Sequence, residues 1–189
     1  MHYNLMFPMR AVKHWNQWSQ GASIGDVARL VEQAGFDGFS MSEHPYPDRG
    51  WLASGGHHAF DPFVSLSFAA AATTRLRVMT YILVSGYRSP YLTAKAAASL
   101  DLLSGGRFTL GTGAGYLKSE FEALGADFGR RGALLDEAID AWRATWACRD
   151  HDGRNFGASD HLALPPPQTE GGPPIWIGGN SAAAQRRVV

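Results

Sequence analysis

Residues 88–116 read RSPYLTAKAAASLDLLSGGRFTLGTGAGY, and this stretch decides the fold class. The Ser-Pro pair at 89–90 predicts the start of a helix, which an alanine-rich run continues to Leu103. Two glycines at 105–106 end that helix, and the residues at 108–111 predict a buried strand directly after it. A helix followed at once by a buried strand is the repeating unit of parallel α/β proteins.

The same unit recurs on both sides of this stretch. Helix-start pairs, apolar periodicity and closing glycines recur along the chain. The predicted strands are 2–7, 36–41, 76–84, 108–111 and 175–177, and the predicted helices are 23–34 with Ser23 as N-cap, 62–72, 90–103, 130–148 and a last one starting at Ser181. Strict alternation of this kind predicts a parallel sheet with right-handed crossovers.

Chain length separates two architectures for this pattern. Five units in 189 residues give about 38 residues per unit, so a closed eight-unit (β/α)8 TIM barrel would need about 300. The alternatives are an open doubly wound sheet and the N-terminal part of a larger barrel. The sequence stops at Val189, inside the last predicted helix, which favours residues 1–189 as one incomplete barrel domain of about five βα units. Its sheet edges would then lack their neighbours, and we expect the chain alone to associate.

Composition limits the partners that the chain would have. It is 45% hydrophobic and carries 17 Lys+Arg against 17 Asp+Glu, so neither nucleic acid nor an anionic membrane is expected as a partner. No apolar run approaches the ~18 residues that would cross a bilayer, and the N-terminus lacks the pattern of a signal peptide. A single cysteine excludes an internal disulfide. We therefore expect a cytoplasmic protein.

Candidate site residues follow the predicted strands, because parallel α/β proteins hold reactive groups beyond the carboxyl ends of their strands. Glu43 and His44 follow the second strand, and a histidine there can exchange protons near neutral pH. The stretch GTGAGY at 111–116 is not a dinucleotide fingerprint, because Tyr116 stands where that motif requires glycine. Its glycines either let a flat ring approach the strand end or form a bare tight turn.

The loop after the fifth strand has two readings as well. Gly178 and Gly179 leave the strand and Ser181 opens a helix, an arrangement that directs backbone N–H groups at an anion. The loop is either a phosphate site or a glycine loop with a serine cap. The neighbours His57 and His58 resemble metal ligands only superficially, since adjacent side chains rarely converge on one ion, so no metal is expected.

Four stretches together carry a resemblance to a known family. They are EQAGFDGFSMSEHP at 32–45, the block at 88–116, EFEALGADFGRRGALLDEAI at 120–139 and PPIWIGGNS at 173–181. In this order they resemble the bacterial luciferase-like family of flavin-dependent oxidoreductases, over practically the whole chain. The resemblance implies a TIM barrel of the luciferase-like type, here truncated, that binds coenzyme F420 or FMN. The arrangement is most similar to the branch assigned to F420.

The resemblance also implies roles for individual residues in the first half of the chain. His44 matches the family histidine that faces the reactive side of the flavin and would be catalytic. Glu43 lies beside it and would contact the substrate. Tyr81 and Ile82 align with the family's non-prolyl cis peptide under the flavin ring.

Further roles are implied at the two later strand ends. Gly113 would border the flavin ring, and the loop with Gly178, Gly179 and Ser181 would receive the cofactor phosphate. Tyr116 stands where several F420-dependent dehydrogenases of the family carry a glutamate, so that acid role does not transfer, and Tyr116 is predicted to contact the substrate.

The function implied is a flavin-type oxidoreductase acting on a small organic substrate. It would use F420, or alternatively FMN, for hydride transfer or O₂-dependent monooxygenation. The full-length form would be a homo-oligomer. Two rivals stay open at this point: a non-catalytic truncated flavin-binding domain or subunit, and a phosphate-binding TIM-barrel isomerase.

Overall fold

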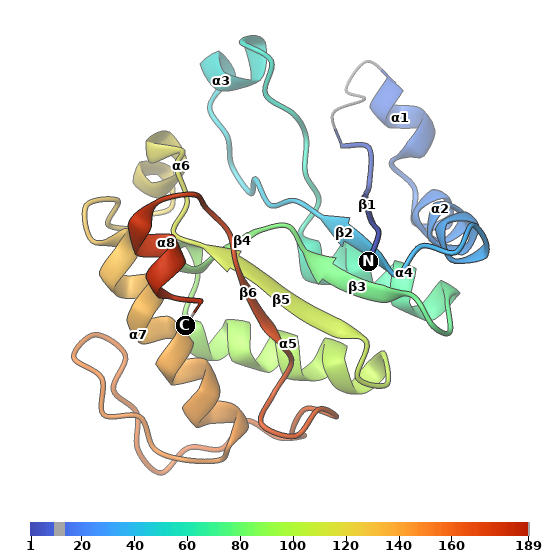
Figure 1. Ribbon diagram of the computed structural model, residues 1–189. Helices are drawn as coiled ribbons and strands as arrows, with labels where there is room; N and C mark the ends of the chain where they lie inside the picture. The colour runs from blue at the N-terminus through green and yellow to red at the C-terminus, as the bar shows by residue number, and fades with distance from the viewer. Residues whose placement is uncertain (10–13, 189) are drawn as a thin grey trace.

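The computed structural model describes residues 1–9 and 14–188, so residues 10–13 and Val189 lie outside the described residues. Along the chain, strands are followed by one or two helices, except that β3 and β4 are adjacent (Figure 1). The strands are β1 (Asn4–Met6), β2 (Gly38–Met41), β3 (Arg77–Thr80), β4 (Leu83–Val84), β5 (Phe108–Gly113) and β6 (Ile175–Ile177). The helices are α1 (Trp15–Trp18), α2 (Gly21–Gln33), α3 (Arg49–Ala53), α4 (Pro62–Ala72), the short 3-10 helix η2 (Ser85–Tyr87), α5 (Pro90–Leu103), α6 (Lys118–Ala123), α7 (Arg131–Trp146) and α8 (Ala182–Arg186).

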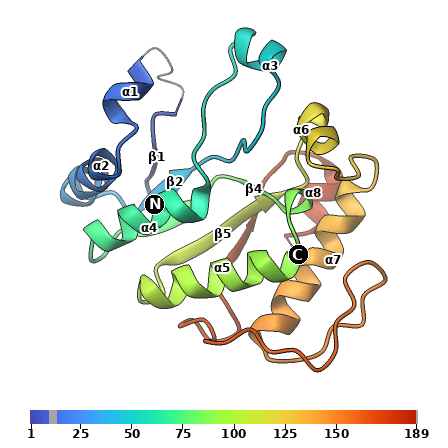
Figure 2. The same cartoon turned by 180° about the vertical axis from the view of Figure 1, so that it is seen from behind.

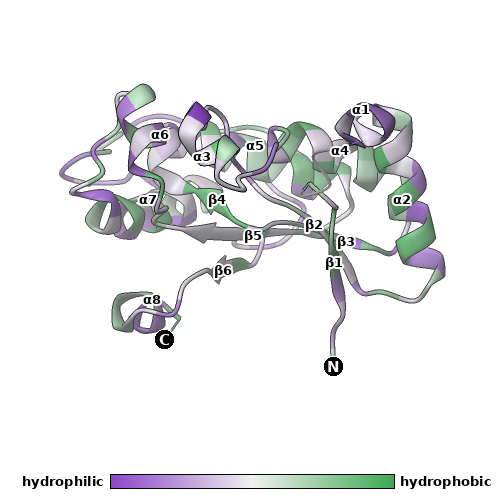
Figure 3. Cartoon of the chain, turned by 90° about the horizontal axis from the view of Figure 1, so that it is seen from above, coloured by the Kyte–Doolittle hydropathy of each residue, from purple (hydrophilic) through white to green (hydrophobic). Residues whose placement is uncertain are grey.

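All strand pairs of the sheet are parallel, and their order follows the chain once β3 and β4, which both pair with β5, are taken as one interrupted strand. β1 pairs with β2, β2 with β3, β3 and β4 both with β5, and β5 with β6. In Figure 3, α4, α5 and α7 lie on one side of the sheet. A doubly wound sheet would carry helices on both faces and reverse its strand order, whereas consecutive order with helices outside is the arrangement of a barrel wall. This confirms the predicted incomplete barrel.

The sequence predicted the main helices because their start signals are local. Asp61 caps α4 by accepting hydrogen bonds from the backbone N–H groups of Phe63 (2.9 Å) and Val64 (3.1 Å), with Pro62 in the first turn. The buried face of α7 packs on α5, and the indole of Trp146 donates to the backbone carbonyl of Ala94 at 3.0 Å. Figure 2 shows these two helices side by side from behind.

Two predictions on element boundaries were wrong. The helix predicted to be capped by Ser23 begins at Gly21, with Gln20 in the N-cap position, because apolar burial of Ile24 and Ala28 fixes its register. The predicted third strand, 76–84, is two strands, β3 and β4, that both pair with β5. The peptide between Tyr81 and Ile82 separates them and is cis, as the resemblance implied.

The core lies between the sheet and the helices that cover it. Phe39, Val78, Phe108 and Leu110 come from the strands, and helices α2, α4, α5 and α7 contribute the apolar side chains that face them. β2 and β5 are buried along their whole length and belong to one parallel sheet, so their carboxyl ends lie at the same edge. This places the residues after Met41 and Gly113 together at one edge of the sheet.

Candidate active site at the strand ends

A buried histidine–carboxylate pair forms the centre of this edge. His44 follows β2, and its Nδ1 lies 3.0 Å from Oε2 of Glu120, a residue of α6. The Glu120 side chain has no exposed surface. A buried carboxylate is stable only when its oxygens are hydrogen-bonded or paired.

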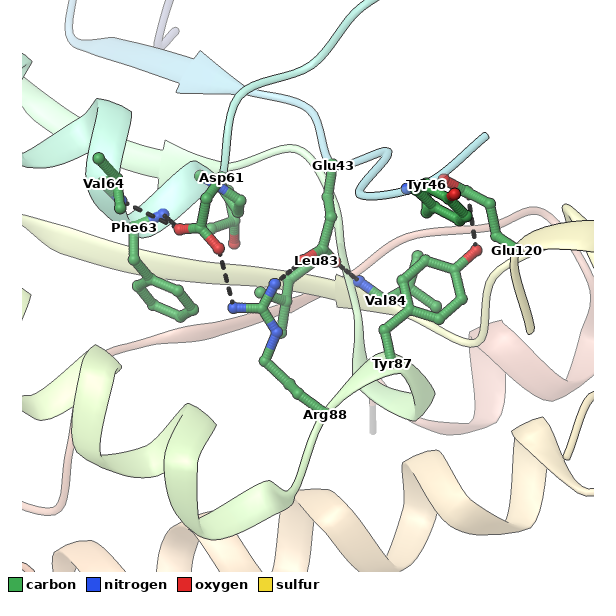
Figure 4. Close-up of polar contacts among 12 residues, drawn as sticks. Glu43, Tyr46, Asp61, Phe63, Val64, Leu83, Val84, Tyr87, Arg88 and Glu120 are labelled. Carbon is green, nitrogen blue, oxygen red and sulfur yellow. Dashed lines mark hydrogen bonds and ion pairs between the residues drawn. The ribbon is translucent and has the colours of Figure 1, made fainter. Parts of the chain in front are cut away.

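Glu120 meets that requirement with two further donors, which Figure 4 shows around it. The Tyr87 hydroxyl donates to Oε2 at 3.0 Å, and the backbone N–H of Tyr46 donates to Oε1 at 3.1 Å. Burial, together with the charge of Glu120 and the hydrogen bond to it, raises the pKa of the Tyr87 hydroxyl well above its usual value. Tyr87 therefore remains a protonated donor, and Glu120 is held from three directions.

Aromatic rings enclose His44 on its other sides. The Trp51 ring of α3 lies 4.4 Å from the imidazole, centre to centre, and the His57 ring lies 5.0 Å away and edge-on. The Tyr116 hydroxyl lies 3.3 Å from Nε2 of His44. The imidazole thus has a hydrogen-bonding partner on each nitrogen and a ring against its face.

Glu43 points away from this pair into a separate polar contact. Figure 4 shows its carboxylate facing Arg88 and the backbone of Val84. It accepts a hydrogen bond of 2.6 Å from the Val84 N–H and one from the Arg88 guanidinium, whose Nη1 lies 3.3 Å from Oδ2 of Asp61. Burial raises the pKa of Glu43 to about 7, although Arg88 and the Val84 N–H act in the opposite direction. These contacts engage the carboxylate within the protein, and its assignment to substrate binding stays a prediction.

The predicted cofactor residues lie at the same edge, around one side chain. A Cβ on Gly113 would lie 2.4 Å from Cδ1 of Ile82, and a Cβ on Gly178 would lie 3.0 Å from the same atom. The last residue of β5 and the first residue after β6 are thus glycines that make room for Ile82, an alternative that the sequence reasoning did not consider. Tyr81 is 55% exposed beside them.

The loop after β6 turns the chain and caps the helix that follows. Gly179 adopts φ of +123°, which favours glycine, and the Ser181 hydroxyl caps α8 by accepting from the Ala184 N–H at 3.2 Å. α8 spans 5 residues. A phosphate contact at this loop stays a prediction.

Sequence reasoning missed Glu120, Tyr87 and Trp51, although the first lies in a quoted motif. The sequence gives few signals for a helix as short as α6: the apolar residues Leu117 and Phe121, and Gly125 after its end. In the structure Gly125 has φ of +68°. Glu120 is buried, whereas Glu122 two residues later is exposed and pairs with Lys118. Both are glutamates in the same short helix, and no local pattern tells them apart.

Two negative findings concern the described residues. None of their His, Cys, Asp and Glu side chains form a group of three or more that could hold a metal ion. In the same part of the chain, no helix is both long and apolar enough to cross a membrane. A cavity of about 900 Å³ is lined by Tyr91, Thr145 and residues 149–152, 157–159 and 161–163. Figure 1 places this loop after α7 at the opposite end of the molecule from α3 and α6, and no predicted site residue lines it.

The fold and the site together define a protein of the TIM-barrel class. Its parallel sheet runs in consecutive order, helices cover the outer side, and titratable side chains lie beyond the strand ends. The family model described as luciferase-like monooxygenase matches residues 2–189. The chain belongs to this family.

Individual relatives extend that finding. An uncharacterized protein of Mycobacterium tuberculosis is 33% identical over 161 residues, covering 74% of this chain and 55% of the relative. The F420-dependent glucose-6-phosphate dehydrogenase of Nocardia farcinica is 33% identical over 162 residues, covering 80% of this chain and 46% of the enzyme. The chain thus spans about half the length of these curated relatives.

One solved structure shows the same fold with a bound flavin. It is the oxygenating constituent of 3,6-diketocamphane monooxygenase from Pseudomonas putida, a type II Baeyer-Villiger monooxygenase in complex with FMN. The TM-score is 0.74 at 18% identity, over 93% of this chain and 50% of that chain. At this identity the likeness establishes the fold alone.

Proposed function

We propose that the chain is the cofactor-binding part of a flavin-type oxidoreductase that uses F420 and acts on a small organic substrate. The observation that carries the proposal is the buried His44–Glu120 pair at the strand ends, with Nδ1 and Oε2 3.0 Å apart. A histidine held in this way can accept and return a proton near neutral pH. The F420-dependent relative from Nocardia farcinica, at 33% identity, favours the deazaflavin.

The residues at the strand ends fit a flat tricyclic ring. Tyr81 and Tyr116 are both more than half exposed there, and Ile82 lies between two glycines that leave it room. Tyr81, Ile82 and Gly113 would hold the ring, and the loop with Gly178, Gly179 and Ser181 its phosphate. When bound, the cofactor supplies the hydride chemistry, while the protein binds, orients and excludes water.

FMN is the second candidate, because the FMN-bound monooxygenase shares the fold. The same pocket would then support O₂-dependent oxygenation instead of hydride transfer to or from a substrate carbon. Titrating the purified chain separately with F420 and FMN and following cofactor fluorescence decides between them. Binding of neither cofactor would contradict the proposed function, and binding without turnover would favour the non-catalytic flavin-binding domain.

His44→Ala is expected to lower turnover by about 10²–10⁴-fold while leaving cofactor affinity little changed, because the imidazole moves a proton and does not hold the cofactor tail. The measurement is kcat beside the cofactor Kd, with glucose 6-phosphate and propan-2-ol as probes. His161→Ala, a histidine exposed on the loop after α7, is the matched control. Equal losses in Kd and kcat would remove His44 from this role.

A further inference from the structure

We propose that Tyr116, His44 and Glu120 form a proton relay, in which the Tyr116 hydroxyl exchanges the proton with the substrate and Glu120 positions His44. This inference rests on the proposed oxidoreductase function, because it names the group through which that site would move its proton.

The three side chains come from separate elements and meet end to end. Tyr116 follows β5, His44 follows β2, and Glu120 belongs to α6. The Tyr116 hydroxyl lies 3.3 Å from His44 Nε2, and His44 Nδ1 lies 3.0 Å from Glu120 Oε2. The first distance is long for a hydrogen bond, and such contacts commonly shorten when a substrate binds.

Solvent exposure falls steadily along the three side chains, from Tyr116 through His44 to Glu120. Tyr116 is 66% exposed, His44 9% and Glu120 0%. The tyrosine hydroxyl is thus the end that a substrate can reach, and the carboxylate is the end that water cannot reach.

The contacts of Glu120 fix which nitrogen of His44 carries the proton. Two of its neighbours, the Tyr46 backbone N–H and the Tyr87 hydroxyl, donate to it, so its oxygens act as acceptors. The third neighbour, His44 Nδ1, must then carry the hydrogen. Nε2 keeps its lone pair and faces Tyr116, which donates to it.

The imidazole is also held against rotation. The Trp51 ring lies over it at 4.4 Å with a tilt of 37°, and the His57 ring meets it at 85°. A ring flip would exchange the two nitrogens and break the contacts to both Glu120 and Tyr116. Packing and hydrogen bonding therefore select the same orientation.

The proton step balances without a further reactant. When an alcohol substrate is oxidised, its O–H proton passes to Oη of Tyr116 as the tyrosine's own proton passes to Nε2 of His44. Oxidation would break the O–H and C–H bonds of the substrate and leave a carbonyl, and a cofactor held by Tyr81, Ile82 and Gly113 would supply the hydride acceptor. The imidazolium that results lies against the Glu120 carboxylate, which stabilises it. In the reverse direction the same groups return the proton to the carbonyl oxygen.

The first test measures the tautomer of His44 in the chain without any cofactor, by long-range ¹H–¹⁵N NMR at neutral pH. We expect the Nδ1–H form in the wild type, its retention with an altered Nε2 resonance in Tyr116→Phe, and loss of its predominance in Glu120→Gln. Tyr3→Phe, an exposed tyrosine on the residue before β1, should leave both resonances unchanged. A wild-type Nε2–H form, or a tautomer that Glu120→Gln does not change, would overturn the relay.

The second test measures turnover with the same probes and with whichever cofactor binds. Tyr116→Phe should lower kcat by about 10²–10⁴-fold with little change in cofactor affinity, and Tyr3→Phe should change neither. Wild-type turnover in Tyr116→Phe would overturn the relay and leave the proposed function standing. Absence of cofactor binding in the wild type would contradict the proposed function, while the NMR result would still decide the relay.

Discussion

Glu43 shows how a single buried carboxylate ties three elements of the site together. Its oxygens contact the Val84 N–H after the cis peptide and the Arg88 guanidinium, which also contacts Asp61 at the start of α4. The backbone that carries Glu43 and His44 is therefore fixed to α4 and to the segment before α5. The orientation of His44 depends on residues that never touch it.

Glu43 also gives the folded protein a defined pH dependence. The pKa of its buried carboxyl is about 7 in the folded chain against 4.5 as the ordinary value, so the folded state binds more protons between these values. The contribution of this group to stability is complete below the lower value and is lost as the pH rises through 7. The wild type should thus lose stability from this source, by about 2 kcal/mol at most, between about pH 5.5 and about pH 8.

The check is urea unfolding at both pH values for the wild type and Glu43→Gln. Gln removes the titration, so the difference in free energy of unfolding between the two pH values should shrink in the variant. All other ionisable groups are present in both proteins and cancel in the comparison. An equal pH dependence in the two proteins would show that Glu43 does not titrate in this range.

Gly111 is required by the close approach of two strands. A Cβ there would lie 2.1 Å from the backbone oxygen of Thr80, which cannot move without shifting β3. Gly111→Ala should lower the free energy of unfolding by about 1–3 kcal/mol in a denaturant titration. Gly132 is a helical position, and a Cβ there would lie 3.4 Å from the flexible end of Arg187. Gly132→Ala should therefore cost nothing, and an equal cost at both positions would disprove the strand-contact explanation.

At the scale of elements, the helix starts carry the clearest local energetics. Asp61 caps α4 through two backbone N–H groups and pairs with Arg88 at 3.3 Å. Asp61→Ala should destabilise the chain by about 0.5–2 kcal/mol through loss of the cap. Asp61→Asn keeps an acceptor for the cap, and its stability should lie near the wild type because a partly exposed ion pair contributes little. Thermal unfolding of both variants checks this, and a loss in Asp61→Asn as large as in Asp61→Ala would assign the effect to the ion pair.

At the scale of the whole molecule, β6 leaves an apolar strand edge open to association. Among the described residues it pairs with β5 alone, and Trp176 at its centre is 57% exposed. An unpaired strand edge with an exposed aromatic invites pairing with a second chain. The expectation that the chain alone associates therefore has a specific location.

Trp176→Lys should weaken this association by about tenfold or more, since a charge on an edge strand opposes pairing. A tenfold change corresponds to about 1.4 kcal/mol. Sedimentation velocity over a range of concentrations gives the measurement. Leu103→Lys removes an even more exposed apolar side chain (82% exposed) at the end of α5, and should leave the association unchanged. A monomeric wild type, or equal effects of both variants, would exclude β6 as the contact.

The sequence by itself determined the order of strands and helices, the starts of α4 and α5, the family and the placement of His44 at a strand end. Those features are local: a proline in the first turn, a closing glycine or a run of apolar residues acts on neighbours in the chain. The break at Tyr81–Ile82 was predicted only through the family resemblance, because the periodicity indicated one strand over 76–84.

Tertiary structure alone decided which carboxylate holds His44. Glu120 lies 76 residues away in the chain and reaches it only because β2 and the segment after β5 end at the same edge of the sheet. Glu43, the nearer carboxylate in sequence, is directed elsewhere by Arg88, because a buried charge must take the partners that packing brings to it.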